Sequence, residues 1–350
     1  MSRDDRPPLT VVDGEPPARR FQLIKAASVE PKAPKWLIRG HLESDSLALV
    51  FGDPGCGKSF LAVDMACSVA TARDFHGHKV THGPVVYLAG EGLNGLARRR
   101  LAWCIRNQES LEDVPLYVST GPAALCDPGS ALEVQRAVDE VAEAEGSPAL
   151  VVVDTLARNF GPGDENSTQD MGIAVQVMDA IRTAHRAAVV LVHHTGHGDK
   201  SRARGAMALK GALDAEYRME KDDEGVVRFE ATKMKDAEPP APSAFRLCTV
   251  ELGFQDDAGD EVTSAVLDPV DWTPPATKQR RSNATRGGRQ QQAMGILRGL
   301  CDDGRLVTPG EWKQALLDEQ IPKRSAEYAM QSLKQHGEVL ENHGCVRPAA

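Results

Sequence analysis

Short apolar segments alternate with longer amphipathic segments over the first two thirds of the chain. Five segments are rich in β-branched residues and nearly free of polar ones, at residues 47–51, 85–89, 116–119, 150–153 and 189–192. Such runs are typical of parallel strands covered on both faces. Helix-like composition fills residues 58–71, 93–107, 131–145 and 170–186 between them. The alternation predicts a doubly wound α/β domain with a mainly parallel, twisted sheet.

The pattern changes after Asp214. Residues 216–220, 226–234 and 245–252 have strand-like composition and are joined by turns such as 222–225, with no room for helices. These segments predict an antiparallel extension of the sheet.

The last part of the chain is expected to form a second, smaller domain. Residues 278–289 hold five basic residues, no acidic ones and paired glycines, which indicates a flexible linker. Beyond it, residues 291–301, 308–319 and 325–336 fit short helices and residues 339–346 a hairpin, the order of a winged helix-turn-helix. We therefore expect a disordered segment at 1–20, an α/β domain at 21–272, a basic linker at 273–290 and a winged-helix-like domain at 291–350.

Composition narrows the function classes. The 350 residues are 41% hydrophobic and 26% charged, with no apolar run approaching the ~20 residues of a membrane span. The polar N-terminus lacks the apolar stretch of a secretory signal, so we expect a cytoplasmic protein with no membrane partner. Seven cysteines are scattered and never spaced Cys-x-x-Cys, which suggests neither a disulfide framework nor a zinc finger.

Charge is unevenly distributed along the chain. The net charge is −9, but residues from Lys278 onward hold twelve Lys/Arg and eight Asp/Glu, which gives +4 there and leaves −13 before it. A basic C-terminal part favours a nucleic-acid contact, and a solvated linker is the alternative.

A glycine-rich segment follows the first predicted strand and opens a predicted helix. Its pattern Gly-x-x-x-x-Gly-Lys-Ser predicts binding of a nucleoside triphosphate, ATP, because the glycines let backbone N–H groups approach phosphate oxygens. Lys58 is expected to bridge the β- and γ-phosphates and Ser59 to ligate Mg²⁺. A glycine turn without function is the alternative. The expected nucleotide-binding residues are Gly52, Asp53, Pro54, Gly55, Cys56, Gly57, Lys58, Ser59 and Phe60.

A carboxylate at the end of another predicted strand supports the magnesium site. Residues 150–153 form an apolar strand that ends in Asp154. A buried carboxylate is costly without a cation or donors nearby, so Asp154 is expected to be a metal-site residue. Its alternative role is a helix N-cap after the strand.

The chain resembles the RepA-type branch of the RecA-like hexameric ATPases, which includes plasmid and phage replicative helicases and is related more distantly to DnaB. The resemblance spans roughly residues 35–235 and rests on a set of motifs in order rather than on the phosphate-binding motif alone. They are Trp36-Leu37-Ile38-Arg39-Gly40, Ser46 to Gly52, Tyr87-Leu88-Ala89-Gly90-Glu91, Arg98 to Arg100, Val153-Asp154-Thr155-Leu156-Ala157-Arg158, Leu191-Val192-His193-His194-Thr195-Gly196 and Arg204-Gly205-Ala206. It implies a RecA-like P-loop core.

Several catalytic roles follow from this resemblance. Glu91 ends the strand after the P-loop helix, where RecA-like proteins place the glutamate that activates water; its alternative is an exposed loop glutamate. His194 ends the strand where such ATPases place a polar sensor of the γ-phosphate. The histidines at 193, 194 and 197 could instead suggest zinc, but no carboxylate stands at a recognisable ligand spacing.

The resemblance also implies partners. Residues 196–210 resemble the loop that lines a central channel and touches single-stranded DNA, with Lys200, Arg202 and Arg204 as the DNA-binding residues and a solvated charged loop as the alternative. RecA-like helicases complete each site with a cation from the neighbouring subunit of a homo-oligomeric ring, here expected to be a hexamer. The candidate cations are Lys210 and Arg218, and spacing does not decide between them. Assembly is expected to depend on contacts other than the large N-terminal collar domain of DnaB-like enzymes.

Three functional hypotheses stay open from the sequence. The first is a replicative DNA helicase or related DNA-stimulated ATPase of plasmid or phage type, with other replication proteins as possible partners. The second is a RecA-like recombinase that coats single-stranded DNA without unwinding it. The third is a nucleotide-dependent DNA-binding regulator or partition factor that acts through its C-terminal domain.

Overall fold

The computed structural model describes residues 23, 25–31, 33–196, 203, 207–272, 288–301, 305–335, 338–342 and 344–349. The chain divides into two units, Met1–Trp272 and Thr273–Ala350. The segment expected to be disordered, 1–20, and most of the expected linker, 273–287, lie outside the described residues.

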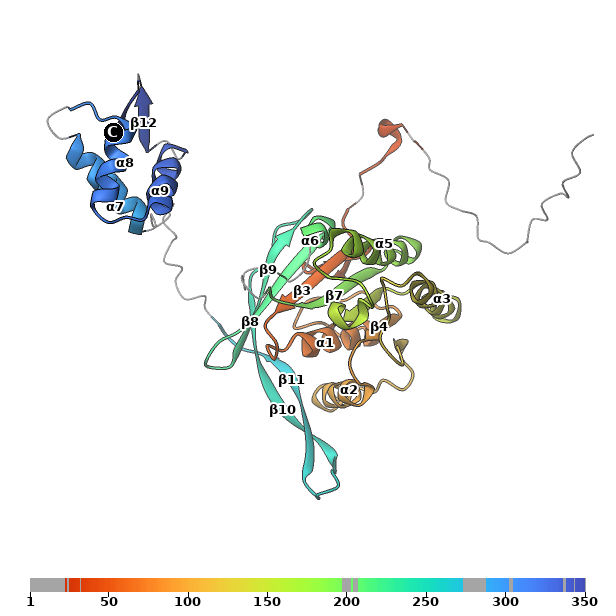
Figure 1. Ribbon diagram of the computed structural model, residues 1–350. Helices are drawn as coiled ribbons and strands as arrows, with labels where there is room; N and C mark the ends of the chain where they lie inside the picture. The colour runs from red at the N-terminus through yellow and green to blue at the C-terminus, as the bar shows by residue number, and fades with distance from the viewer. Residues whose placement is uncertain are drawn as a thin grey trace, which may run out of the picture. The chain divides into compact units, whose positions relative to one another are not determined.

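The first unit is an α/β structure built on one sheet that has both parallel and antiparallel strand pairs (Figure 1). Within the described residues this sheet has nine strands in the order β11-β10-β9-β8-β3-β7-β6-β4-β5. The parallel part comprises β3 (Leu47–Gly52), β4 (Val85–Ala89), β5 (Leu116–Val118), β6 (Leu150–Asp154), β7 (Ala188–His194) and β8 (Ala215–Lys221). A mostly parallel central sheet fits a RecA-like P-loop core, as the sequence predicted.

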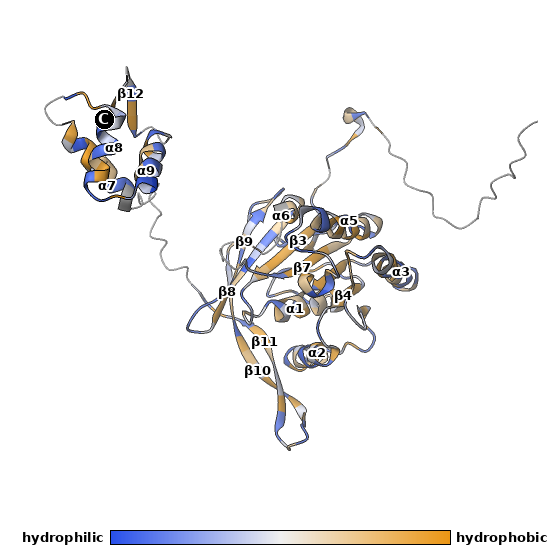
Figure 2. Cartoon of the chain, viewed as in Figure 1, coloured by the Kyte–Doolittle hydropathy of each residue, from blue (hydrophilic) through white to orange (hydrophobic). Residues whose placement is uncertain are grey.

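Helices cover both faces of the parallel part. On one face α1 (Lys58–Thr71) and α2 (Leu93–Asn107) pack on alternate strand residues such as Val50, Val152 and Val190. On the other face α3 (Pro128–Glu145), α4 (Leu156–Asn159), α5 (Thr168–His185) and α6 (Met207–Ala212) pack on Leu49 and Val151. Figure 2 shows the resulting hydrophobic strands between more polar helices. This burial on both faces explains why the strands are nearly continuous apolar runs.

The antiparallel extension begins one strand later than the sequence predicted. Strand β8 was assigned to the extension, but it pairs parallel with β3 and antiparallel only with β9 (Val226–Met234). The helix α6 before it supplies the crossover that a parallel pair requires. The extension continues with β10 (Ser243–Gln255) and with β11 (Glu261–Pro269), which was not predicted; together they form a ribbon that runs beyond the sheet (Figure 1).

A small structure precedes the sheet. It contains the 3₁₀ helix η1 (Ala26–Ser28) and the antiparallel pair β1 (Trp36–Ile38) and β2 (Leu42–Glu43). No helix within the described residues is long and apolar enough to cross a membrane.

The second unit has its own hydrophobic core around Trp312, which is fully buried. It contains α7 (Gly288–Leu300), α8 (Pro309–Asp318), α9 (Lys323–Gln335) and an antiparallel hairpin of β12 (Val339–Asn342) and β13 (Cys345–Pro348). Thr308 and Glu311 form a capping box that fixes the start of α8. Three helices and a hairpin follow one another in the predicted order; the winged-helix assignment stays a prediction.

Candidate functional site

The glycine-rich segment connects β3 to α1 at the carboxyl edge of the parallel strands. Gly55 and Gly57 have φ angles of +77° and +98°, which favour glycine. Gly52 is required for a different reason: a Cβ there would lie 2.3 Å from the backbone oxygen of Met219 on β8. This close packing on a neighbouring strand holds the loop at the start of α1, where backbone N–H groups and the helix dipole favour an anion.

Lys58 is the first residue of α1 and is 5% exposed. Its Nζ donates hydrogen bonds of 2.9 Å to the backbone oxygens of both Gly52 and Asp53. Burial lowers the pKa of Lys58, and the nearby Cys56 and Asp154 oppose this shift. The ammonium group is therefore held within its own loop by two carbonyl oxygens that phosphate oxygens can replace.

Asp154 stands at the end of β6 and is nearly buried. Ser59 Oγ donates to Asp154 Oδ1 at 3.1 Å, and the buried Tyr87 hydroxyl donates to Oδ2 at 2.6 Å. Burial raises the pKa of the Asp154 carboxyl, whereas these two hydrogen bonds act to lower it. A hydroxyl and a carboxylate 3.1 Å apart are the hard oxygen ligands that Mg²⁺ prefers, so Ser59 and Asp154 fit this ion.

Glu91 comes just after β4, which is separated from β3 in the sheet by β7 and β6. Its side chain is 54% exposed, and Oε2 lies 3.9 Å from Arg99 Nη2 on α2. Arg99 in turn lies over the ring of Phe60, 5.2 Å from its centroid. Arg99 lowers and Glu91 raises the pKa of Asp154, so both charges act on the magnesium ligand. The base role of Glu91 stays a prediction.

The residue before Glu91 fixes the chain at this edge. Gly90 N donates to the backbone oxygen of Asp154 at 2.7 Å, and a Cβ on Gly90 would lie 2.3 Å from the Cβ of Arg158. Only glycine fits this contact between the end of β4 and α4. Because Ala89 stands opposite Asp154 in the β4–β6 pair, Glu91 follows at the same edge of the sheet.

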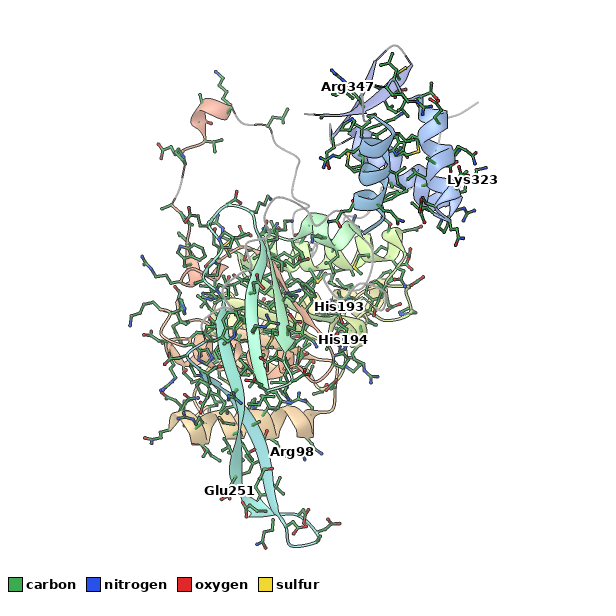
Figure 3. The ribbon with its side chains drawn as sticks, turned by 90° about the vertical axis from the view of Figure 1, so that its left-hand side faces the viewer. Arg98, His193, His194, Glu251, Lys323 and Arg347 are labelled. Atoms are coloured by element: carbon green, nitrogen blue, oxygen red, sulfur yellow. The ribbon has the colours of Figure 1, made fainter. Side chains whose placement is uncertain are left out.

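The end of β7 is tied to the glycine-rich loop. In the parallel pairing with β3, His194 stands opposite Gly52, and Figure 3 shows His193 and His194 next to one another. Thr195 N donates to Gly52 O at 3.2 Å, and its hydroxyl donates to the Asp53 carboxylate. His194 is partly exposed at this edge, and its sensor role stays a prediction.

His193 is fully buried, and its Nε2 lies 3.8 Å from Glu165 Oε2. Within the part of the chain that the structure describes, no cluster of His, Cys, Asp or Glu has the arrangement of a metal site.

The two candidate trans-acting cations both form ion pairs within their own chain. Lys210 Nζ lies 3.3 Å from Oε1 of the buried Glu216, and Arg218 Nη2 lies 3.3 Å from Glu220 and 3.5 Å from Glu230. Arg218 stands opposite Phe51 in the β3–β8 pair and lines a cavity of about 470 Å³ beside the loop, together with residues 53–56, Thr195 and 219–222. The predicted DNA-binding residues Lys200, Arg202 and Arg204 lie outside the described residues.

Sequence reasoning missed three residues of this site. Tyr87 and Thr195 bind the carboxylates of Asp154 and Asp53, and Arg99 bridges Phe60 and Glu91. A polar hydroxyl within the apolar strand 85–89 was the available signal for Tyr87. All three residues fall within the motifs of the resemblance, but only the fold places them against the site.

Comparison with known proteins gives one family. A family model described as AAA domain matches residues 14–200, more than half of the chain, and this span contains the glycine-rich loop, Glu91, Asp154 and His194. No curated protein matches the chain.

Proposed function

Because this chain belongs to the AAA domain family, we propose that it is an ATP-driven DNA motor, a helicase that hydrolyses ATP at the subunit interfaces of a ring. Family membership makes it a nucleotide-hydrolysing P-loop ATPase. Single-stranded DNA as its track, the hexameric ring and a role in plasmid or phage type replication are the proposal.

Different residues of the site bind the phosphates, bind Mg²⁺ and activate the attacking water. Lys58 exchanges its hydrogen bonds to Gly52 and Asp53 for β- and γ-phosphate oxygens. Ser59 and Asp154 would hold Mg²⁺, which supplies charge neutralisation on the phosphates. Glu91, at the end of the adjacent strand, orients or deprotonates the attacking water. This charge balance requires the Asp154 carboxylate to be ionised when nucleotide is bound.

The single observation that carries the DNA proposal is the anchoring of the basic segment to the nucleotide loop. Thr195 bonds to Gly52 and to Asp53, and it also forms an antiparallel bridge with Ala203. The described residues Thr195 and Ala203, which flank Lys200 and Arg202 in the sequence, are therefore joined to each other and, through Thr195, to the phosphate-binding loop. A change at Asp53 on nucleotide binding would act on Thr195 and through it on Ala203, which is the coupling that a DNA-stimulated ATPase needs.

The ring proposal rests on the partners of the cations close to the nucleotide site. Among the described residues, the cations nearest the loop already have partners: Lys58 bonds to loop carbonyls, Arg218 pairs with Glu220 and Glu230, and Arg99 pairs with Glu91. A cation from a neighbouring subunit can be worth 10³ to 10⁵ in rate. We propose Lys210 or Arg218 of a neighbouring copy for this role, which requires the side chain to exchange its own ion pair for the γ-phosphate.

Strand displacement on a forked DNA substrate tests the proposal. The wild-type protein should separate the strands in the presence of Mg–ATP, and ATP turnover should rise when single-stranded DNA is added. Lys58→Ala is the control, because it removes the phosphate contact but leaves residues 197–206 unchanged. DNA-stimulated turnover without strand separation would favour the recombinase hypothesis, and turnover that ignores DNA would contradict the motor altogether.

A further inference from the structure

The second unit presents one helix face whose polar side chains have no hydrogen-bond or ion-pair partner among the described residues. Helix α9 buries Ala326, Ala329 and Leu333 against the core of the unit. Arg324, Tyr328 and Gln331 are exposed on its other side, and Tyr328 is 70% exposed. Within the described residues these three side chains make no hydrogen bond or ion pair. Figure 2 shows hydrophilic residues along this helix.

The spacing of these side chains gives one continuous stripe. Arg324, Tyr328 and Gln331 stand at positions i, i+4 and i+7, which share one helix face. At 1.5 Å per residue the stripe is about 10 Å long, which is close to three base-pair steps of ~3.4 Å each. An α-helix with its side chains is ~10–12 Å wide and fits the ~12 Å major groove.

The charges around α9 favour an anionic partner. Its one acidic residue, Glu327, is paired with Lys313 at 2.6 Å, and the acidic Glu341 on β12 is paired with Lys334 at 2.7 Å. At the start of α9, Arg324 forms no ion pair within the described residues, and Lys323 lies close enough to Glu327 to interact with its charge. From Thr273 to Ala350 the sequence holds twelve Lys/Arg and eight Asp/Glu, whereas the rest of the chain carries a formal charge of −13.

A further cation stands on the hairpin. Arg347 of β13 is exposed and pairs in register with Leu340 of β12. Figure 3 shows Lys323 and Arg347 on two different elements of this unit. Two cations on separate elements can contact two points of a phosphate backbone, which fixes orientation.

The aromatic content favours a duplex over a single strand. Proteins that hold single strands stack successive bases on several aromatic side chains. Residues 288–350 contain two aromatic residues, Trp312 and Tyr328, and Trp312 is fully buried in the core. One exposed tyrosine offers no such platform, whereas Arg and Gln match guanine and adenine edges in the major groove.

We propose that α9 and the β12–β13 hairpin form a binding site for double-stranded DNA, with α9 in the major groove. Arg324 and Gln331 contact base edges, and Lys323 and Arg347 contact phosphates. The four-residue connection between α8 and α9 is that of a helix-turn-helix, in which the second helix enters the groove through its N-terminal residues. This site is separate from the motor and does not depend on its proposed function.

Fluorescence anisotropy with the full-length protein tests this proposal without nucleotide. The probes are a labelled 20-base-pair blunt duplex and its single strand. The double variant Arg324→Ala/Gln331→Ala should raise the duplex Kd at least about tenfold, and Lys323→Ala should reduce the salt slope by about 1. Arg298→Ala is the matched control, because Arg298 is an exposed arginine on α7 without a partner among the described residues; it should stay within about twofold.

The outcomes separate this site from the motor. Lys58→Ala should bind the duplex with the same Kd as the wild type. Failure of the helicase proposal would therefore not contradict the duplex-binding site. Equal duplex affinity in the double variant and in Arg298→Ala would overturn it. A parallel loss of single-strand affinity in the double variant, or a wild type that does not bind the duplex, would overturn it as well. Thermal melting of the second-unit variants checks that this unit is folded, since the substituted side chains form no hydrogen bond or ion pair among the described residues.

Discussion

The hydroxyl of Tyr87 is predicted to hold the magnesium ligand Asp154 in its working orientation. The change Tyr87→Phe removes one oxygen and leaves the ring in its buried place between α1 and the sheet. It removes the 2.6 Å hydrogen bond to Asp154 Oδ2, while Ser59 still donates to Oδ1. The carboxylate then has one buried oxygen without its donor.

The size of the expected effect follows from the negative charge on Asp154, which accepts this hydrogen bond. A buried hydrogen bond to an ionised group contributes about 1.5–3 kcal/mol, and ~2 kcal/mol corresponds to roughly a 30-fold change in affinity. For a unit of this size the same energy lowers the melting temperature by about 4–8 °C. Because the Tyr87 hydrogen bond lowers the pKa of Asp154, its loss raises that pKa further, and the carboxylate ionises only at higher pH.

Binding of a fluorescent ATP analogue at increasing Mg²⁺ is the assay. Tyr87→Phe should need roughly 10- to 30-fold more Mg²⁺ to reach half saturation, with its pH profile moved to higher pH, while metal-free nucleotide binding changes little. Tyr117→Phe is the matched control: its hydroxyl donates to Glu145 Oε1 at 2.7 Å on the surface of β5, where such a bond contributes little. Identical Mg²⁺ titrations and melting temperatures for the two variants would refute the reasoning.

Three further predictions concern the site and the fold. Lys58→Ala should lower ATP affinity and abolish turnover, because no other side chain replaces its contact to the phosphates; isothermal titration and phosphate release measure this, and normal turnover would contradict it. Glu91→Gln should keep ATP affinity and reduce turnover about 100-fold or more, and unchanged turnover would remove Glu91 from the mechanism. Burial and the nearby His78 lower the pKa of His41 to about 4. The unfolded chain therefore takes up the proton first, so stability falls by up to ~3 kcal/mol as pH drops from about 6.5 to 4; urea unfolding should show this loss in the wild type and a flatter profile in His41→Phe, and equal profiles would contradict it.

The parallel core was predictable because its strands are buried on both faces. The predicted bounds of α1 and α2, 58–71 and 93–107, agree with the structure, since both helices follow directly from glycine-rich turns at strand ends. Strand β11 was missed because Glu261, Thr263 and Ser264 give it a polar pattern, and because it is an edge strand covered only in part. Its burial against α2 depends on contacts distant in sequence.

The sequence predicted those parts of the site that lie within local motifs at strand ends. Lys58, Ser59 and Asp154 come together because parallel strands bring their carboxyl ends to one edge, which a sequence pattern already implies. The partners of these groups are not local: Tyr87 lies 67 residues from Asp154, and Thr195 lies 142 residues from Asp53. Pairings of this kind depend on strand order, and no spacing in the chain encodes the order β3-β7-β6-β4.

Electron microscopy of the full-length protein with a non-hydrolysable ATP analogue, Mg²⁺ and single-stranded DNA tests the central claim most directly. The account predicts a ring in which each triphosphate lies on residues 52–59 with Mg²⁺ between Ser59 and Asp154, a neighbouring subunit supplies Lys210 or Arg218, and DNA passes along residues 196–210. Nucleotide bound away from Lys58 and Asp154, or particles that stay monomeric with DNA and nucleotide present, would contradict it.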